Sequence, residues 1–228
     1  EQWIWASLWL WLAVVLKPIA LAPWLLALAS FPQMRKPLLL GIVPFLLMGL
    51  AHPDFHYASE RWVKCLEKIF RSYTPENLRV SDLFGMLEKA GIPNVPKVNS
   101  VTRALACLGA LAWVWHSTRQ KGFLAGSWAL WVATALIFTV FNPRAETNGY
   151  VLISPVLAFA ALSYWREVKG GKLPAAMLAF ACIALMCDGM GLWIYKATDV
   201  WLKPLIVIVV SPLLFRVPEG WKSENPVG

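Results

Sequence analysis

Long apolar stretches separated by polar connections run through the whole chain. The apolar stretches cover residues 3–31, 37–51, 104–116, 123–141, 150–165, 173–187 and 204–215. A helix needs about 20 residues to cross a bilayer, so the shorter stretches must extend into flanking residues to span a membrane. The pattern predicts an all-α polytopic membrane helix bundle with about seven transmembrane segments.

The first stretch, residues 3–31, is interrupted by Lys17 and Pro18. It is too long for one upright helix, and a proline inside a helix removes a backbone hydrogen bond and kinks or ends the helix. Two interpretations stay open, namely one tilted and broken span or two segments that meet near Pro18.

Positively charged residues mark alternate connections. The basic connections carry Arg35 and Lys36, then Arg119 and Lys121, then Arg166, Lys169 and Lys172. The connections between them, 52–100, 142–149 and 188–203, mix both signs of charge. Because short basic loops of membrane proteins stay in the cytoplasm, we expect the basic connections and the tail from Arg216 to face the cytoplasm. The mixed connections then face outward.

The outer loop 52–100 is the only sizeable polar region. Its apolar residues recur at helical spacing at Trp62, Val63, Leu66, Ile69 and Phe70. Charged residues fill the positions between them, which predicts an amphipathic helix that lies along the membrane surface or covers the outer end of the bundle.

A second, short helix follows in the same loop. Ser81 is a candidate N-cap, and Gly91 followed by Pro93 can end the helix. The segment 91–97 is expected to be an extended connector back to the membrane.

Composition and charge support the membrane assignment. The 228 residues are 58% hydrophobic and 15% charged, with 14 tryptophans, and the mean hydropathy is +0.56. Soluble domains average about 45–50% apolar and about 25% charged residues, and indole rings suit the headgroup boundary. The net charge of +8 lies between apolar stretches rather than along one face, so it does not indicate nucleic-acid binding.

The start of the chain and the cysteines limit the interpretation further. Glu1 precedes an apolar run with no basic segment of a signal peptide, so residues 1–228 are expected to form a single membrane domain, the C-terminal part of a longer protein. The cysteines show no metal-ligand spacing and are expected to be small buried apolar residues. They are Cys65, Cys107, Cys182 and Cys187.

Ionisable residues at membrane depth or at span ends are costly and mark candidate sites. Lys17 stands where a broken helix frees backbone carbonyls, and its ammonium can meet an anion there; the alternative is a lysine that extends to the interface. His52, Asp54 and His56 alternate and could bind a metal on an extended segment. Such residues are more often polar groups at a membrane exit, and no metal site or cofactor is predicted.

The last outward connection carries Asp188, Lys196, Asp199 and Lys203. Mixed charges between short apolar stretches are most often a solvated turn, and we expect one here. Motifs of soluble catalytic sites, such as G-x-S-x-G, the Walker loop, H-E-x-x-H and G-x-G-x-x-G, are absent from the sequence.

The connection N-P-R-A-E-T-N-G-Y, residues 142–150, has the most informative pattern. Arg144, Glu146, Asn148 and Tyr150 alternate, so an extended stretch would point them to one side. Arginine binds phosphate, a carboxylate binds arginine or a sugar hydroxyl, and Asn and Tyr supply hydrogen bonds and a stacking face. The set suits a sugar or sugar phosphate, and the alternative is an Arg–Glu ion pair that fixes a tight loop.

The stretch N-P-R-A-E-T-N-G-Y-V-L-I-S-P resembles the late motif of glycosyltransferase family 87, membrane-embedded mannosyltransferases of the GT-C superfamily that use polyprenyl-phosphate sugars. Lys17 and Pro18, after a Trp- and Leu-rich run, are similar to the mid-chain lysine motif of that family. Residues 80–87, V-S-D-L-F-G-M-L, loosely resemble its Asn-x-Ser-Leu-x-Gly-Leu-Leu stretch. The resemblance covers most of the chain in the same order.

The resemblance implies an inverting hexosyltransferase on the outer face of the bacterial inner (plasma) membrane. A sugar, expected to be mannose, passes from a polyprenyl-phosphate donor to a lipid or glycan acceptor. Lys17 and Arg144 would hold the donor phosphate, while Glu146, Asn148 and Tyr150 would bind the sugar or acceptor. The partners are thus the donor, the acceptor and membrane lipid, and no nucleic acid.

Departures from the family pattern matter as well. The acidic residue of the first outer loop is expected upstream of Glu1, so the catalytic base is unknown and this chain alone is expected to lack transferase activity. Asn148 and Gly149 stand where some relatives have paired histidines, and Arg79 replaces the Asn of the loop motif. Two alternatives stay open: a transporter or lipid-flipping subunit, which would also have broken helices, and a non-catalytic membrane scaffold.

Overall fold

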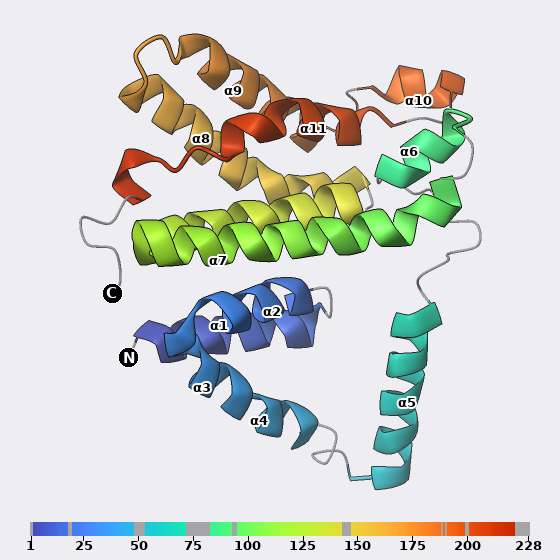
Figure 1. The fold of residues 1–228 in the computed structure, drawn as a ribbon. Helices are drawn as coiled ribbons and strands as arrows, with labels where there is room; N and C mark the ends of the chain where they lie inside the picture. The colour runs from blue at the N-terminus through green and yellow to red at the C-terminus, as the bar shows by residue number, and fades with distance from the viewer. Residues whose placement is uncertain are drawn as a thin grey trace. The chain divides into compact units, whose positions relative to one another are not determined.

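The computed structural model describes residues 2–17, 20–47, 53–71, 83–92, 95–142, 147–187, 189, 191–198 and 201–221. All regular elements in these ranges are helical, which confirms the predicted all-α class (Figure 1). The chain divides into two compact units, Glu1–Leu78 and Arg79–Gly228, and each is described by itself.

The described part of unit 1 contains five α-helices. They are α1 (Gln2–Leu16), α2 (Leu21–Ser30), α3 (Pro32–Leu40), α4 (Ile42–Leu47) and α5 (Phe55–Arg71). The α-helix ends at Leu16, one residue before Lys17, and α2 begins at Leu21, so the stretch 3–31 contains two short helices. Arg35 and Lys36, expected in a connection, lie inside α3 instead, because Pro32 occupies a helix N-terminus and starts the helix before them.

Trp11 of α1 holds the first helices of unit 1 together. Its indole Nε1 donates a hydrogen bond to the Leu38 carbonyl at 2.9 Å, and its ring packs edge-on against Trp24 at 5.3 Å between centroids. A Cβ atom on Gly41 would lie 1.9 Å from the Trp11 Nε1, so only glycine lets the ring approach there. In unit 1, Trp11 and Trp24 thus pack between helices, whereas Trp5 and Trp9 are exposed on the surface.

The amphipathic helix predicted in the outer loop is confirmed as α5. Asp54 caps its N-terminus, since Asp54 Oδ1 accepts a hydrogen bond from the Tyr57 backbone N–H at 3.0 Å. Trp62, on the predicted apolar face, packs against Phe45 of α4 at 5.2 Å. Its placement on a membrane surface stays a prediction.

Unit 2 contains the remaining elements. They are α6 (Leu83–Lys89), α7 (Val95–Leu136), the π-helical η3 (Ile137–Phe141), the 3-10 helix η4 (Thr147–Ile153), α8 (Ser154–Glu167), α9 (Lys172–Met186), α10 (Leu192–Thr198), α11 (Lys203–Leu214) and the 3-10 turn η5 (Glu219–Trp221). The apolar stretches from residue 104 onward therefore all lie in helices.

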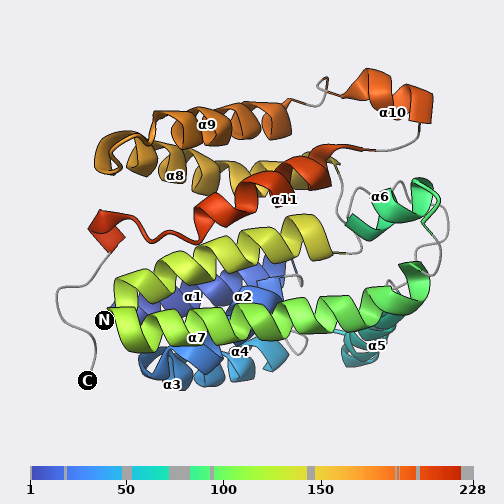
Figure 2. The same ribbon diagram turned by 45° about the horizontal axis from the view of Figure 1, so that its top comes forward.

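Helix α7 folds back on itself at Gly122 (Figure 2). The Gly122 backbone has φ 86° and ψ 176°, a left-handed conformation that favours glycine. The two arms approach each other closely beside the turn. A Cβ on Gly126 would lie only 2.1 Å from Thr118 Oγ1, so glycine is needed at this position. The predicted stretches 104–116 and 123–141 are thus separate antiparallel arms.

The basic connections of unit 2 gather at one end. The turn at Gly122, the turn between α8 and α9 and the segment after α11 all lie on the left in Figures 1 and 2, whereas α6, α10 and the start of η4 lie at the other end. We call this the basic end. Its exposed cations are Arg119, Lys121, Arg166, Lys169 and Lys172.

Aromatic side chains fill the core of unit 2 near the basic end. Trp128, Trp131, Phe159 and Trp221 pack against one another, with centroid distances from 5.8 to 6.3 Å. Trp128 is fully buried, and its Nε1 donates to the Leu214 carbonyl at the end of α11 at 3.1 Å. This cluster attaches η5 to α7 and α8.

The outer surface of the described helices carries many large apolar side chains, and their packed faces combine small residues with larger ones such as Leu157 and Leu178. On α9, Ala175, Ala181 and Ala184 are buried, whereas Leu173, Phe180 and Ile183 are exposed. Buried Ala160, Ala161 and Ser163 line α8. On α1 the buried residues are Ser7 and Val14, and the exposed ones include Trp5, Trp9 and Leu16. A water-soluble helix has the opposite arrangement.

In the described ranges, one helical segment, Asn99–Phe141, is long and apolar enough to cross a membrane, judged by length and composition alone. Gly122 divides this segment into two arms of about 20 residues each, the length that one span requires. The other apolar helices, α1, α2, α9 and α11, have between 10 and 17 residues. The number of about seven transmembrane segments therefore stays a prediction.

Of two boundaries in the outer connection 52–100, one is as expected and the other differs. Gly91 ends α6 as predicted, with φ 78° and a hydrogen bond from the Ile92 N–H to the Leu87 carbonyl at 3.1 Å. The connector expected to be extended through residue 97 is instead helical from Val95, because Pro96 fits the first turn of α7. Ser81 lies outside the described residues.

Candidate functional site

Lys17 lies directly after α1 with an exposed side chain. Its backbone N–H donates to the Ala13 carbonyl at 2.8 Å, and its own carbonyl accepts from the Ala20 N–H at 2.9 Å, so hydrogen bonding continues past the end of α1. An exposed ammonium at a helix C-terminus interacts favourably with the helix dipole. Both an anion-binding lysine and an interfacial lysine fit this position.

The connection 142–150 is described only in part. Arg144 and Glu146 lie outside the described residues. Asn148 belongs to η4, and Tyr150 is fully buried in the core of unit 2. The premise of an extended stretch is wrong for 147–150, because a 3-10 helix turns once in about three residues and sends alternate side chains in different directions.

Tyr150 therefore has a structural role that the sequence did not indicate. Its ring belongs to the same hydrophobic cluster as Ile153, Leu178 and Val207. Binding of sugar or acceptor by Glu146, Asn148 and Tyr150 stays a prediction, and for Tyr150 it would require movement of η4.

Lys203 is a buried cation that sequence reasoning placed in a solvated turn. Lys203 is 2% exposed. It is the first residue of α11 and lies against the last turn of α9. The Nζ atom donates to the Leu185 carbonyl in the last turn of α9 at 3.2 Å and lies 5.9 Å from the ring centroid of Trp201. A cation at a helix C-terminus is favourable there, which explains the burial.

Other parts of that connection also differ from expectation. Residues 192–198 form α10 after Gly191, whose φ of 86° is a left-handed turn conformation. Tyr195 stacks on Trp201 at 4.4 Å between centroids. Lys196 is exposed as expected, and Asp188 and Asp199 lie outside the described residues.

Arg103 is a second buried cation of unit 2 that the sequence did not single out. It is 9% exposed, and its guanidinium lies 5.0 Å from the ring centroid of Phe84 in α6. The ring centroids of Phe84 and Phe141 lie 6.5 Å apart, and Phe141 is the residue before Asn142. Arg103 and Lys203 both belong to helix segments at the end opposite the basic end (Figure 1).

The candidate metal ligands do not form a site in the described part of the chain. Asp54 caps α5 and His56 is exposed, while His52 lies outside the described residues. The described residues include no group of three His, Cys, Asp or Glu side chains placed to hold a metal ion.

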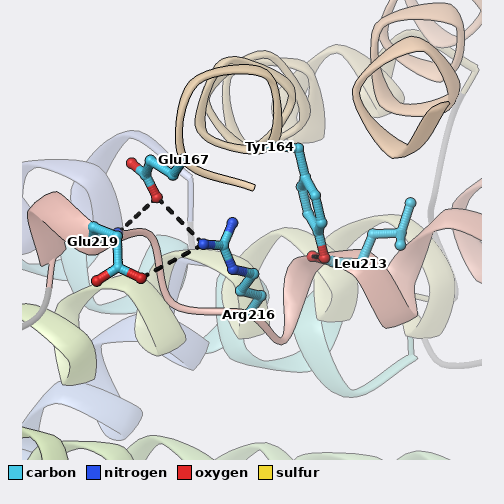
Figure 3. A network of polar contacts seen from close by, with 5 residues as sticks. All are labelled: Tyr164, Glu167, Leu213, Arg216 and Glu219. Atoms are coloured by element: carbon cyan, nitrogen blue, oxygen red, sulfur yellow. Dashed lines mark hydrogen bonds and ion pairs between the residues drawn. The ribbon is translucent and has the colours of Figure 1, made fainter. Parts of the chain in front are cut away.

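A network of polar contacts in unit 2 lies at the basic end (Figure 3). Arg216 Nη2 lies 3.7 Å from Glu167 Oε2 and 3.6 Å from Glu219 Oε1. The Glu219 N–H donates to Glu167 Oε2 at 2.8 Å, and the Tyr164 hydroxyl donates to the Leu213 carbonyl at 3.2 Å. This network closes the segment after α11 onto α8.

Unit 2 therefore has two chemically different ends. Buried cations, Asn142 and the start of η4 occupy one end, and exposed cations with paired carboxylates occupy the other. A scan against models of known protein families finds no match to this chain, and neither a search of curated proteins nor a search of solved structures finds one.

Proposed function

We propose that the chain is the membrane-embedded part of a glycosyltransferase that transfers a sugar from a polyprenyl-phosphate donor to a lipid or glycan acceptor. Membrane placement is supported by the exposed surface of α1, α8 and α9, where large apolar residues face outward and several alanines and serines lie on the packed faces. In lipid, small residues allow close helix packing and apolar residues face the acyl chains.

The orientation follows from the two ends of unit 2. Cytoplasmic loops of membrane proteins are rich in Lys and Arg, so the basic end faces the cytoplasm and the 142–150 connection faces outward. On this proposal about seven segments cross the bacterial inner membrane, with short helices completed by flanking residues.

The single observation that carries the transferase proposal is the stretch of residues 142–155, which resembles the late motif of family 87. Its place at the end that holds the buried cations Arg103 and Lys203 supports the same reading. A departing phosphate is an anion, and fixed cations in a water-poor site lower the energy of the transition state in which that charge develops. Lys17 and Arg144 are the proposed phosphate ligands.

The transferase proposal is tested by Arg144→Ala in the protein as its gene encodes it. Sugar transfer from polyprenyl-phosphate mannose is measured in membranes, with Arg119→Ala as the matched control at the basic end. We expect transfer to fall about 10²-fold or more for Arg144→Ala, as when one stabilising donor is removed from an active site, and to be unchanged for Arg119→Ala. Equal transfer by both variants would refute the phosphate role of Arg144.

Orientation is tested separately from catalysis. The native cysteines are replaced by serine, and single cysteines are introduced by Lys169→Cys at the basic end or Gly189→Cys between α9 and α10. A membrane-impermeant thiol reagent added to intact cells should label only the Gly189→Cys protein. Labelling of both positions, or of Lys169→Cys alone, would contradict the proposed placement.

Lipid or solute transport without transferase chemistry is the second candidate. It is favoured by the interruption of regular α-helix in η3 and η4, since discontinuous helices recur at transporter binding sites. Reconstituted vesicles distinguish the two: movement of a labelled polyprenyl-phosphate sugar across the bilayer, with no transfer to any acceptor, would favour the transporter.

A further inference from the structure

The basic end of unit 2 is a concentrated and exposed positive surface. Its five exposed cations come from the α7 turn and from the connection between α8 and α9, which lie at the same end of unit 2 in both ribbon views, with the segment after α11 between them (Figures 1 and 2). No carboxylate in the described ranges forms an ion pair with any of the five within 4.0 Å. The surface is therefore available to an external anion.

The two described carboxylates near this surface share one cation, Arg216. Glu167 and Glu219 both contact the Arg216 guanidinium, and Glu167 also accepts the Glu219 backbone N–H (Figure 3). Arg216 further lies 5.3 Å from the ring centroid of Tyr164. Arg216 offsets one of the two acids, so six basic residues face two acidic ones in the described part of this end, which therefore stays net positive and attracts an anionic partner.

Exposed indole rings accompany the cations. The Arg119 guanidinium lies 5.9 Å from the ring centroid of Trp115, and Lys172 Nζ lies 5.9 Å from that of Trp165. Trp115 is 50% exposed and Trp165 is 61% exposed, on helices whose neighbouring surface is apolar. Indole beside Lys or Arg is the combination found at the boundary between acyl chains and headgroups.

We infer that the basic end binds the phosphates of anionic phospholipids in the facing leaflet. A free phosphate or a nucleic acid would use the cations but would leave the indoles and the exposed apolar side chains beside them, such as Leu173 and Leu162, in water. An anionic phospholipid supplies a phosphate for the cations and acyl chains for the apolar surface at the same place. The inference rests on the proposed membrane placement and is independent of transferase activity.

The test measures which lipids the protein retains. The full chain is reconstituted in phosphatidylcholine vesicles containing a minority of phosphatidylglycerol, extracted with its nearest lipids in polymer-bounded nanodiscs, and the two lipids are quantified. We expect phosphatidylglycerol to be enriched over its share of the vesicle. Each cation near an anionic surface changes affinity by about fivefold, so Lys169→Gln should lower the relative affinity for phosphatidylglycerol by that factor.

A charge-matched control separates a specific surface from net charge. The double variant Lys169→Gln/Lys172→Gln should lose the enrichment, whereas Lys89→Gln/Lys196→Gln, which removes two exposed lysines from α6 and α10, should keep it. Higher salt should reduce the enrichment of the unchanged protein. Equal loss in both double variants, no enrichment at any salt concentration, or displacement of the lipid by inorganic phosphate would overturn the inference. All of these outcomes leave the Arg144 transfer assay unaffected, so the two proposals fail separately.

Discussion

Substitution of Trp128 tests whether the aromatic cluster holds the C-terminal segment onto unit 2. Trp128 contacts Trp131, Phe159 and Trp221, and its indole N–H is bonded to the Leu214 carbonyl. Trp128→Phe keeps an aromatic ring but removes the donor, while Trp128→Ala removes the ring as well. Comparison of the two variants separates the hydrogen bond from the packing.

The expected magnitudes follow from burial. Trp128 is fully buried, so loss of its donor leaves the Leu214 carbonyl without that partner and should cost about 1–3 kcal/mol. Trp128→Ala adds a cavity and should cost about 3–5 kcal/mol in total. For a chain of this size about 1 kcal/mol lowers the melting temperature by about 2–4 °C, so Trp128→Ala should lower it by about 6–20 °C.

Thermal unfolding in detergent micelles, followed by circular dichroism, measures these shifts. Trp115→Phe is the matched control, because that ring is half exposed on the same helix and should shift the melting temperature by less than about 2 °C. A Trp128→Phe protein as stable as the Trp115→Phe protein would refute the reasoning, since it would mean that the buried indole bond contributes nothing.

Three further predictions concern the core and the polar surface. Tyr150→Ala should lower the free energy of unfolding by about 3–5 kcal/mol, measured by chemical denaturation, because the ring is fully buried. Lys203→Ala should lower the melting temperature by removing the donor to the Leu185 carbonyl and opening a cavity, and Lys203→Met, which fills the space, should restore part of the loss. The hydrogen bond and charge of Lys64 lower the pKa of Glu60 below its ordinary value. The stabilisation of α5 from this pair is present above the unfolded pKa and is lost as pH falls through the folded pKa; Lys64→Gln should raise the Glu60 pKa in an NMR titration.

Helix positions were largely predictable because hydrophobic runs and end signals act locally. The break near Pro18, the amphipathic α5 and the end of α6 at Gly91 all depend on residues within one or two turns. The α10 helix was missed because its seven residues lie among charges that resemble a solvated turn. Local patterns therefore find elements, but short elements between charges are ambiguous.

Burial of individual polar residues was not predictable, because it depends on contacts far apart in the sequence. Lys203 donates a hydrogen bond to the carbonyl of Leu185, 18 residues away in the sequence. No residue adjacent to Lys203 indicates that partner. Tyr150 was assigned to a site from its alternation with Arg144 and Glu146, a pattern that has meaning only on an extended backbone. The 3-10 geometry of η4 removes that premise for Tyr150, whereas the residues of the same motif outside the described ranges keep their predicted roles.

The lengths of the helices limit how unit 2 can lie in a bilayer on the proposed placement. The 15 residues of α9 extend about 22 Å, less than the roughly 30 Å of a typical hydrocarbon core, whereas the second arm of α7 with η3 extends about 28 Å. Trp165 and Lys172 fix one end of α9 at a headgroup boundary, and Trp193, which is 74% exposed on α10, follows its other end. Both boundaries are thus set by residues that prefer the interface, so on the proposed placement the mismatch is met by flanking residues and a thinner bilayer around α9 rather than by sliding the helix through it.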